Sequence, residues 1–222
     1  MLGTLNARCA ETVASVRADG KNPPVFGAGR SDRPGLMFVG EAPGEREAMN
    51  GVPFVGKAGS RLTYYLDKLG IRRDEIYITN VVKIRPTRMT KGGRTANRAP
   101  DQAEVDMFLP FLLEEIAIVK PRLLVTLGVV ALKALLSRDS EIKTCHGCLF
   151  QTMICPPVGM PWSYPLFALY HPASLIYNHA LEAVYDHDIE RLACLRERWE
   201  NDTEQIGPSA ERRMIPSSAE MP

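Results

Sequence analysis

Long apolar runs are absent from this sequence. No stretch of eighteen or more apolar residues occurs, so the sequence predicts no membrane span. The N-terminus also lacks the basic-then-apolar order of a signal peptide, and we therefore expect a cytoplasmic protein. An excess of one charge sign is missing too, since the formal net charge is only +1. A nucleic-acid-binding function would therefore require positive charge to be concentrated in one part of the surface.

Cysteine is scarce and odd in number, with 5 residues in a chain expected to be cytoplasmic, which argues against a disulfide framework. Cys145 and Cys148 form a Cys-x-x-Cys pair, and with Cys155 they could supply three ligands of a zinc or iron–sulfur site. The alternative is free thiols around a loop, because buried cysteine behaves as a small hydrophobe. Only His146 stands close by to complete a tetrahedral set. We favour free thiols and expect no metal and no other cofactor.

The chain of 222 residues, 45% hydrophobic and 24% charged, is long enough for one α/β domain. Apolar runs of strand length alternate with segments of helical periodicity, which predicts a parallel sheet covered on both faces. The expected strands are 36–39, 76–78, 123–127 and 166–170, and the expected helices are 1–20, 60–69, 101–119, 129–136 and 181–199. Residues 1–200 are predicted to form the single domain, and the polar, proline-containing segment 201–222 a disordered tail.

Polar residues follow several of these strands directly. Gly40 and Glu41 follow the first strand, Asn80 the second, Gly128 the third and His171 the fourth. Ligands of parallel sheets bind at the carboxyl ends of the strands, so these residues predict a small-ligand or catalytic site at one rim of the sheet. Taken singly, each could be only a turn or a helix cap.

A basic segment follows the second strand, with six cations in sixteen residues and no acid before Asp101. It suits phosphate contacts, although a solvated mobile loop is the alternative, since Gly92 and Gly93 indicate flexibility. The six are Lys83, Arg85, Arg88, Lys91, Arg94 and Arg98.

Four blocks in this order and spacing resemble the uracil-DNA glycosylase superfamily, and specifically its family 4 branch. They are residues 40–44 (Gly-Glu-Ala-Pro-Gly), 51–59 (Gly-Val-Pro-Phe-Val-Gly-Lys-Ala-Gly), 79–86 (Thr-Asn-Val-Val-Lys-Ile-Arg-Pro) and 170–175 (Tyr-His-Pro-Ala-Ser-Leu). The resemblance implies a three-layer αβα sandwich around a four-stranded parallel sheet. It also implies an enzyme that flips uracil out of DNA and hydrolyses its N-glycosidic bond in base excision repair.

The resemblance also implies roles at the base. Phe54 would stack on the flipped uracil, and the amide of Asn80 would match its pairing edge. The backbone of Gly40 and Ala42 would hold another uracil carbonyl, and His171 would donate a hydrogen bond to O2 as charge develops there. The best-known branch has an aspartate in place of Ala42. A carboxylate must then come from elsewhere, and the candidates are Glu41 and, preferred, Glu47.

For the DNA itself, the resemblance implies phosphate contacts from Lys57 and Ser60. We expect Lys83 and Arg85, from the basic segment, to contact DNA as well. Residues 174–176, Ser174, Leu175 and Ile176, would contact the duplex, the last two as an exposed apolar wedge that fills the vacated space. Tyr177 stands where relatives often have arginine. The expected partner is uracil-containing DNA, bound by a monomer.

One departure from the family is plain. Family 4 members characteristically hold a [4Fe–4S] cluster with four cysteines, and here the corresponding residues are Thr12, Ser15, Ile84 and Phe108. None can ligate iron as a thiolate does, so we expect no cluster at that place. This leaves open a cluster-free glycosylase, one acting on another deaminated base such as hypoxanthine, or a non-catalytic binder of damaged DNA or abasic sites.

Overall fold

The fold is described from a computed structural model, which covers residues 1–16 and 23–205, with side chains up to residue 198. The helices are α1 (Leu2–Val16), α2 (Glu45–Asn50), α3 (Lys57–Lys68), η1 (Arg73–Glu75), α4 (Gln102–Val119), α5 (Val129–Leu135), α6 (Ile142–Cys145), α7 (Ser174–Tyr177), η2 (His179–Leu181) and α8 (Glu182–Gln205). The strands are β1 (Ala28–Gly29), β2 (Leu36–Gly40), β3 (Tyr77–Asn80), β4 (Thr87–Met89), β5 (Thr95–Asn97), β6 (Leu123–Leu127), β7 (Leu149–Ile154) and β8 (Trp162–Leu169).

The central sheet has six strands in the order β1-β3-β2-β6-β8-β7. The four middle strands are parallel, as the apolar runs predicted, while β1 and β7 are antiparallel strands at the two edges. The count of four strands was therefore incomplete. The sequence pattern missed β7 because its side chains alternate between buried and exposed, and β1 because it has only two residues.

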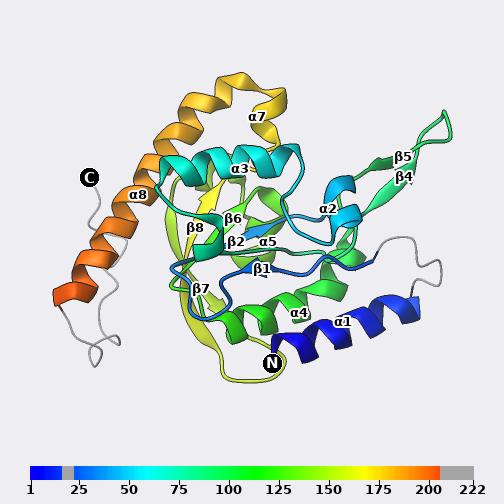
Figure 1. The fold of residues 1–222 in the computed structure, drawn as a ribbon, viewed down its shortest axis with the longest axis horizontal. Helices are drawn as coiled ribbons and strands as arrows, with labels where there is room; N and C mark the ends of the chain where they lie inside the picture. Colours follow the sequence, from blue (N-terminus) through cyan, green and yellow to red (C-terminus); the bar gives the residue numbers. More distant parts are fainter. Residues whose placement is uncertain (17–22, 206–222) are drawn as a thin grey trace.

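Helices cover both faces of this sheet (Figure 1). Alternate residues of β2 enter two separate apolar clusters: Met37 and Val39 pack with α1, α4 and α5, and Leu36 and Phe38 pack with α3 and α8. The αβα layering is confirmed. Each cluster fixes one face of the strand ends, so the rim of the sheet is held from both sides.

The basic segment forms a two-stranded hairpin, β4–β5, that projects from the body (Figure 1). Its turn is closed by hydrogen bonds between Thr90 and Arg94, with Gly93 at φ 71°. The segment is therefore a hairpin and not an irregular loop. The sequence pattern missed it because three-residue strands give too short an alternation to be recognised.

The two ends of the chain agree only in part with the elements predicted from the sequence. Helix α8 continues to Gln205, past residue 201 where the tail was expected to begin. Segments 17–20 of the first expected helix and 206–222 of the expected tail lie outside the described residues. Within the described part, no helix is both long and apolar enough to cross a membrane.

Candidate active site at the strand ends

A glycine lies at the centre of the rim formed by the carboxyl ends of the parallel strands. Gly40 ends β2 and is paired in register with Asn80 at the end of β3. A Cβ atom on Gly40 would lie 2.5 Å from Asn80 Oδ1 and 2.5 Å from Phe54 Cζ. The absence of a side chain at Gly40 therefore lets an amide and an aromatic ring converge on the same point of the backbone.

Asn80 presents an unused hydrogen-bond acceptor in this place. Its side chain is only 2% exposed, and its Oδ1 has no hydrogen-bond partner among the described residues. Buried polar atoms are normally paired, and an unpaired one costs on the order of 1–3 kcal/mol. Such an acceptor beside an aromatic ring is suited to a donor supplied by a ligand.

The loop that carries Phe54 is held by backbone contacts. Phe54 is buried and has φ 55°, a left-handed conformation that is rare for an aromatic residue. Glu47 Oε1 accepts hydrogen bonds from the backbone N–H groups of Val55 and Gly56, at 3.0 and 2.7 Å. A Cβ on Gly59 would lie 1.9 Å from the Phe54 carbonyl oxygen, so this glycine lets α3 pack directly against the loop. Together these contacts fix the ring over the rim.

His171 follows β8 and faces the same ring, with 5.9 Å between the centroids of the Phe54 and His171 rings. Its Nδ1 lies 3.2 Å from the backbone N–H of Ala173 and accepts from it, so the neutral ring carries its proton on Nε2. Burial lowers the pKa of His171 to about 4, against an opposing effect of the Glu47 charge. At neutral pH the group is therefore an uncharged Nε2–H donor.

Glu41 and Ala42 continue the loop from Gly40. Glu41 is half-buried, and burial raises the pKa of its carboxyl. Its carbonyl oxygen accepts from the Val82 N–H at 3.0 Å, which joins the loop to the residues after β3. Ala42 is half-buried against the cluster under α4, and it carries no group for acid–base work.

The predicted DNA contact of Lys83 is wrong. Its place in the basic segment predicted a contact with DNA, but the side chain is buried, with 2% of its surface exposed. Its Nζ donates to Glu115 Oε2 at 2.6 Å, to Thr79 Oγ1 at 2.8 Å and to the Asn80 carbonyl at 2.7 Å. Tyr77 and Thr79 donate to the same carboxylate. Lys83 therefore clamps the end of β3 to α4 and cannot reach a phosphate.

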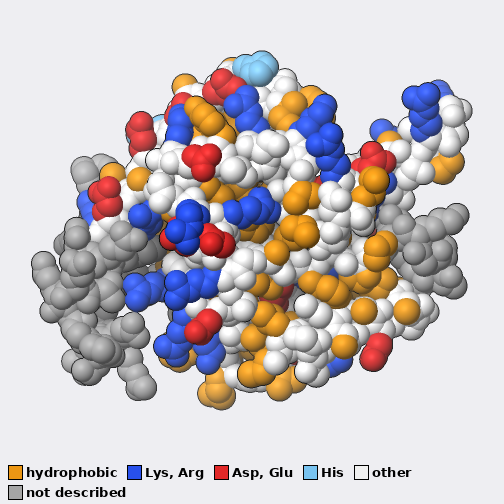
Figure 2. Space-filling model, viewed as in Figure 1, with side chains coloured by type: hydrophobic (Ala, Val, Ile, Leu, Met, Phe, Trp, Pro, Cys, Tyr) orange, Lys and Arg blue, Asp and Glu red, His pale blue; other side chains and the backbone are white. Residues whose placement is uncertain are grey.

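The other cations of the basic segment divide into two groups. Arg85 donates to Asn97 and Glu45, and Arg98 forms an ion pair with Glu104 at 2.6 Å, so both anchor the base of the hairpin. The remaining three are exposed and lack a side-chain partner among the described residues. These are Arg88, Lys91 and Arg94, and Figure 2 shows basic side chains at the hairpin tip.

The residues expected to contact DNA differ in how far they are exposed to solvent. Lys57 and Ser60 lie exposed in the first turn of α3. Leu175 is fully buried in the cluster under α3 and α8, so its assignment as an exposed wedge is wrong. Ser174 and Ile176 are half-buried. The sequence misled here because α7 turns its second residue toward the core, which a four-residue segment does not reveal.

The cysteines do not gather into a cluster in the described part of the chain, where no group of three or more His, Cys, Asp or Glu residues could hold a metal ion. Cys145 and Cys148 are half-buried, and Cys155 is exposed. His146, between the first two, is 2.9 Å from Asp188 on α8.

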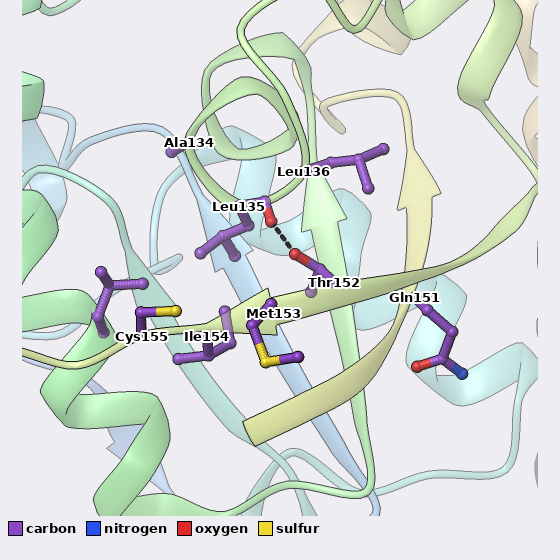
Figure 3. Close-up of a pocket in the computed structure, with 9 residues that line it drawn as sticks. Ala134, Leu135, Leu136, Gln151, Thr152, Met153, Ile154 and Cys155 are labelled. Carbon is purple, nitrogen blue, oxygen red and sulfur yellow. Dashed lines mark hydrogen bonds between the residues drawn. The ribbon is translucent and has the colours of Figure 1, made fainter. Parts of the chain in front are cut away.

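A cavity of about 320 Å³ lies elsewhere, between the last turn of α5 and strand β7 (Figure 3). Leu135, Thr152 and Met153 are among its lining residues, and Thr152 donates to the Leu135 carbonyl across it. Helix α5 begins at the rim and runs away from it, so this cavity is at the opposite end of the sheet. No residue of the candidate site lines it.

Comparison with known proteins agrees with this geometry. The family model described as the uracil DNA glycosylase superfamily matches residues 26–201. The chain belongs to the uracil DNA glycosylase superfamily. A Type-4 uracil-DNA glycosylase of Pyrobaculum aerophilum is 39% identical to it over 159 residues, which cover 70% of this chain and 74% of that protein. Another such enzyme, from Thermotoga maritima, is 35% identical over 170 residues, covering 75% and 80% respectively.

Among solved structures, SMUG2 of Pedobacter heparinus superposes with a TM-score of 0.50 and 13% identity, over 76% of this chain and 77% of that one. At this identity the likeness concerns the fold alone. The superfamily fold is therefore supported both by sequence and by structure.

Sequence reasoning missed two contributors to the site. Gly59 was not singled out, although it is a glycine inside a helix, which already indicates close backbone packing. Glu115 lies on α4, 32 residues from Lys83, and nothing local to either residue indicated that they form an ion pair.

Proposed function

We propose that this protein removes uracil from DNA by hydrolysing its N-glycosidic bond, as the first step of base excision repair. The observation that supports this best is the buried, unpaired Oδ1 of Asn80 beside the Phe54 ring and the His171 imidazole. Uracil offers an N–H donor between two carbonyl acceptors, so it satisfies an amide acceptor, an amide donor and an imidazole N–H at once. Cytosine presents the opposite polarity at its pairing edge and would leave Oδ1 facing another acceptor.

In the proposed reaction the base leaves as an anion. The Nε2–H of His171 donates to the uracil O2 as negative charge develops, in the manner of an oxyanion hole. Because the pKa of His171 is lowered to about 4, it acts as a neutral donor rather than as an acid that loses its proton. Phe54 stacks on the base, and the backbone at Gly40 and Ala42 faces its other carbonyl. These groups orient the base before the bond breaks.

The carboxylates Glu41 and Glu47 are assigned to the water and to the cationic sugar. Glu47 uses Oε1 for the two backbone N–H groups of the Phe54 loop, which leaves Oε2 for this role. Glu41 has a raised pKa through burial, so its neutral form is favoured relative to an exposed glutamate. These two observations favour Glu47 over Glu41 for this role.

The substitution pair Glu47→Gln and Glu41→Gln separates the two carboxylates. Glutamine at 47 keeps an oxygen for the backbone N–H groups but removes the charge, so we expect kcat to fall about 10²- to 10⁴-fold, with a much smaller fall for Glu41→Gln. Single-turnover cleavage rates measure both. A larger loss for Glu41→Gln would reverse the assignment.

DNA contacts are proposed at Lys57 and Ser60 on α3 and at Ser174 and Ile176 on α7, with the exposed hairpin cations binding phosphates further out. Arg85 acts indirectly, because it positions the hairpin through Glu45 and Asn97. We also propose that the protein works as a monomer in the cytoplasm.

The residues at the family's cluster positions do not fit an iron–sulfur cluster. Ile84 and Phe108 are fully buried in the apolar cluster under α4 and offer no ligand atom. Thr12 and Ser15 use their hydroxyls on backbone carbonyls within α1. We infer that packing of Ile84 and Phe108 takes over the stabilising role there. A brown protein with broad absorption near the visible blue would contradict this.

The direct test of function uses oligonucleotides with one uracil, as single strands and as duplexes opposite guanine or adenine. After incubation, abasic sites are cleaved with alkali. We expect strand breaks at uracil, and none with a matched thymine oligonucleotide. No breaks above background on any uracil substrate would overturn the proposal, and binding without breaks would favour a non-catalytic binder. Hypoxanthine and xanthine substrates in parallel define the base preference.

A further inference from the structure

The end of β8 leads directly to His171, and backbone hydrogen bonds hold it on two sides. On the side of β6, the Gly128 N–H donates to the Leu169 carbonyl at 2.8 Å. On the other side, residues 147–148 exchange two hydrogen bonds with the residue before Leu169, at 2.8 and 3.2 Å. Tyr170 follows, and it links this fixed part of the strand to His171.

The ring of Tyr170 contacts the imidazole of His146. The two ring centroids are 4.8 Å apart and the ring planes are inclined by 33°. Aromatic rings attract one another at separations of about 4.5–7 Å. His146 directly follows α6 and directly precedes the residues 147–148 that bond to β8. Its side chain therefore extends the support of the strand to Tyr170.

Asp188, on α8, fixes the orientation of the His146 ring. The carboxylate is buried, with 1% exposure, and its Oδ2 lies 2.9 Å from His146 Nδ1. Gly147 has φ 67°, and a Cβ there would lie 2.2 Å from Asp188 Oδ1, so the missing side chain lets the carboxylate approach the turn. A carboxylate oxygen accepts a hydrogen bond, so Nδ1 of His146 carries the hydrogen. Such a bond holds an imidazole in one tautomer and one orientation.

We propose that His146, oriented by Asp188, is a positioning residue for His171. The inference rests on the proposed function, because it concerns the placement of the imidazole that donates to the uracil O2. The contacts form a series from α8 to the site: Asp188 holds His146, His146 stacks on Tyr170, and Tyr170 precedes His171. Catalysis by a preorganised donor depends on its position, and an error of about 1 Å can cost on the order of 10²-fold in rate.

His146→Asn is the main test. Asparagine keeps an N–H donor for the buried Asp188 carboxylate but removes the ring that stacks on Tyr170. We expect kcat on a single-stranded uracil substrate to fall about 10- to 100-fold and KM to stay within about twofold, because the base is still bound while its donor is misplaced. The free energy of unfolding, from chemical denaturation, should remain close to that of the parent.

A double-mutant cycle separates positioning from a general structural effect. In a His171→Ala background there is no imidazole to position, so His146→Asn should cause no further fall in kcat. Asp188→Asn, which keeps an acceptor oxygen but removes the charge, should cause a smaller fall, also confined to the background with His171. Equal falls in both backgrounds, or a rise in KM with kcat unchanged, would overturn the proposal.

His187→Ala is the matched control. His187 precedes Asp188 on α8, but its side chain is 69% exposed and lies 3.9 Å from Glu190 on the same helix. Its loss should leave kcat and KM unchanged.

A second measurement is independent of cleavage. In nuclear magnetic resonance spectra of the histidine rings, the His171 Nε2–H signal should be the same in the parent and His187→Ala and should shift in His146→Asn. An unchanged His171 signal in His146→Asn would contradict the positioning role. A shifted signal together with no cleavage by the parent would contradict the proposed function only.

Discussion

The strand-end site and the β4–β5 hairpin present two opposite ways of arranging polar groups. At the site, Asn80 is buried beside Gly40, and Glu47 is buried and accepts two backbone N–H groups of the Phe54 loop. On the hairpin, Arg88, Lys91 and Arg94 are exposed and project from the body. Under the proposed function, the first arrangement would select one base by geometry, and the second would offer charge to any phosphate. The proposal therefore assigns base selectivity and DNA affinity to separate parts of the molecule.

Lys83 belongs to the buried part despite its place in the basic segment, and its loss should have the largest effect. Lys83→Met leaves the Glu115 carboxylate buried without its cation, so we expect the free energy of unfolding to fall by about 3–5 kcal/mol. Chemical denaturation measures this. The double variant Lys83→Met/Glu115→Gln should recover much of the loss, and a stable single variant with weakened DNA binding would restore Lys83 to the phosphate contacts.

Asn80→Ala removes the amide from the base pocket. We expect kcat/KM on uracil substrates to fall about 10²- to 10³-fold, because a preorganised hydrogen-bonding group is lost where the base is held. Steady-state cleavage of single-stranded substrate is the measurement. Thr126→Val is the control: Thr126 Oγ1 is also buried and unpaired among the described residues, but β6 directs this side chain to the opposite face of the sheet from Phe54. An equal loss in both variants would mean that packing, not base recognition, is affected.

The triple variant Arg88→Ala/Lys91→Ala/Arg94→Ala tests the hairpin. We expect KM for DNA to rise roughly tenfold at physiological salt, the slope of log affinity against log salt to become shallower by about 2–3, and kcat to stay the same. Fluorescence anisotropy at several salt concentrations gives the slope. Lys120→Asn, which removes an exposed cation before β6 at the other end of the sheet, should leave it unchanged. A fall in kcat in the triple variant would show that the two regions are not separate.

The smallest effect concerns pH. Because burial lowers the pKa of His171 to about 4, its imidazole stays neutral from pH 8 down to about pH 5, and kcat should be independent of its titration over that range. Nuclear magnetic resonance of the ring should show the Nε2–H tautomer and a midpoint near 4. A midpoint near the ordinary value of about 6.5 would mean that the pocket is more hydrated than its geometry indicates.

The rim residues were predictable because each follows an apolar run directly, and parallel strands end at one edge. This rule alone was sufficient to predict that Gly40, Asn80 and His171 lie at the same rim. Lys83 and Leu175 were misassigned because their surroundings are set by partners distant in sequence, Glu115 for the first and the α3–α8 cluster for the second. Burial of a side chain in a short turn is a property of the packed whole, and a local pattern of residue types does not contain it.

Helix α2 has only six residues, yet it takes part in both regions. Glu45, at its start, is 3.1 Å from Arg85 at the base of the hairpin, and Glu47 holds the loop that presents Phe54. These two carboxylates are separated by one residue on a single rigid turn. The same small helix therefore contacts both the base of the hairpin and the loop that carries Phe54. Under the proposed function, α2 is a direct structural connection between the proposed phosphate contacts of the hairpin and the proposed base pocket.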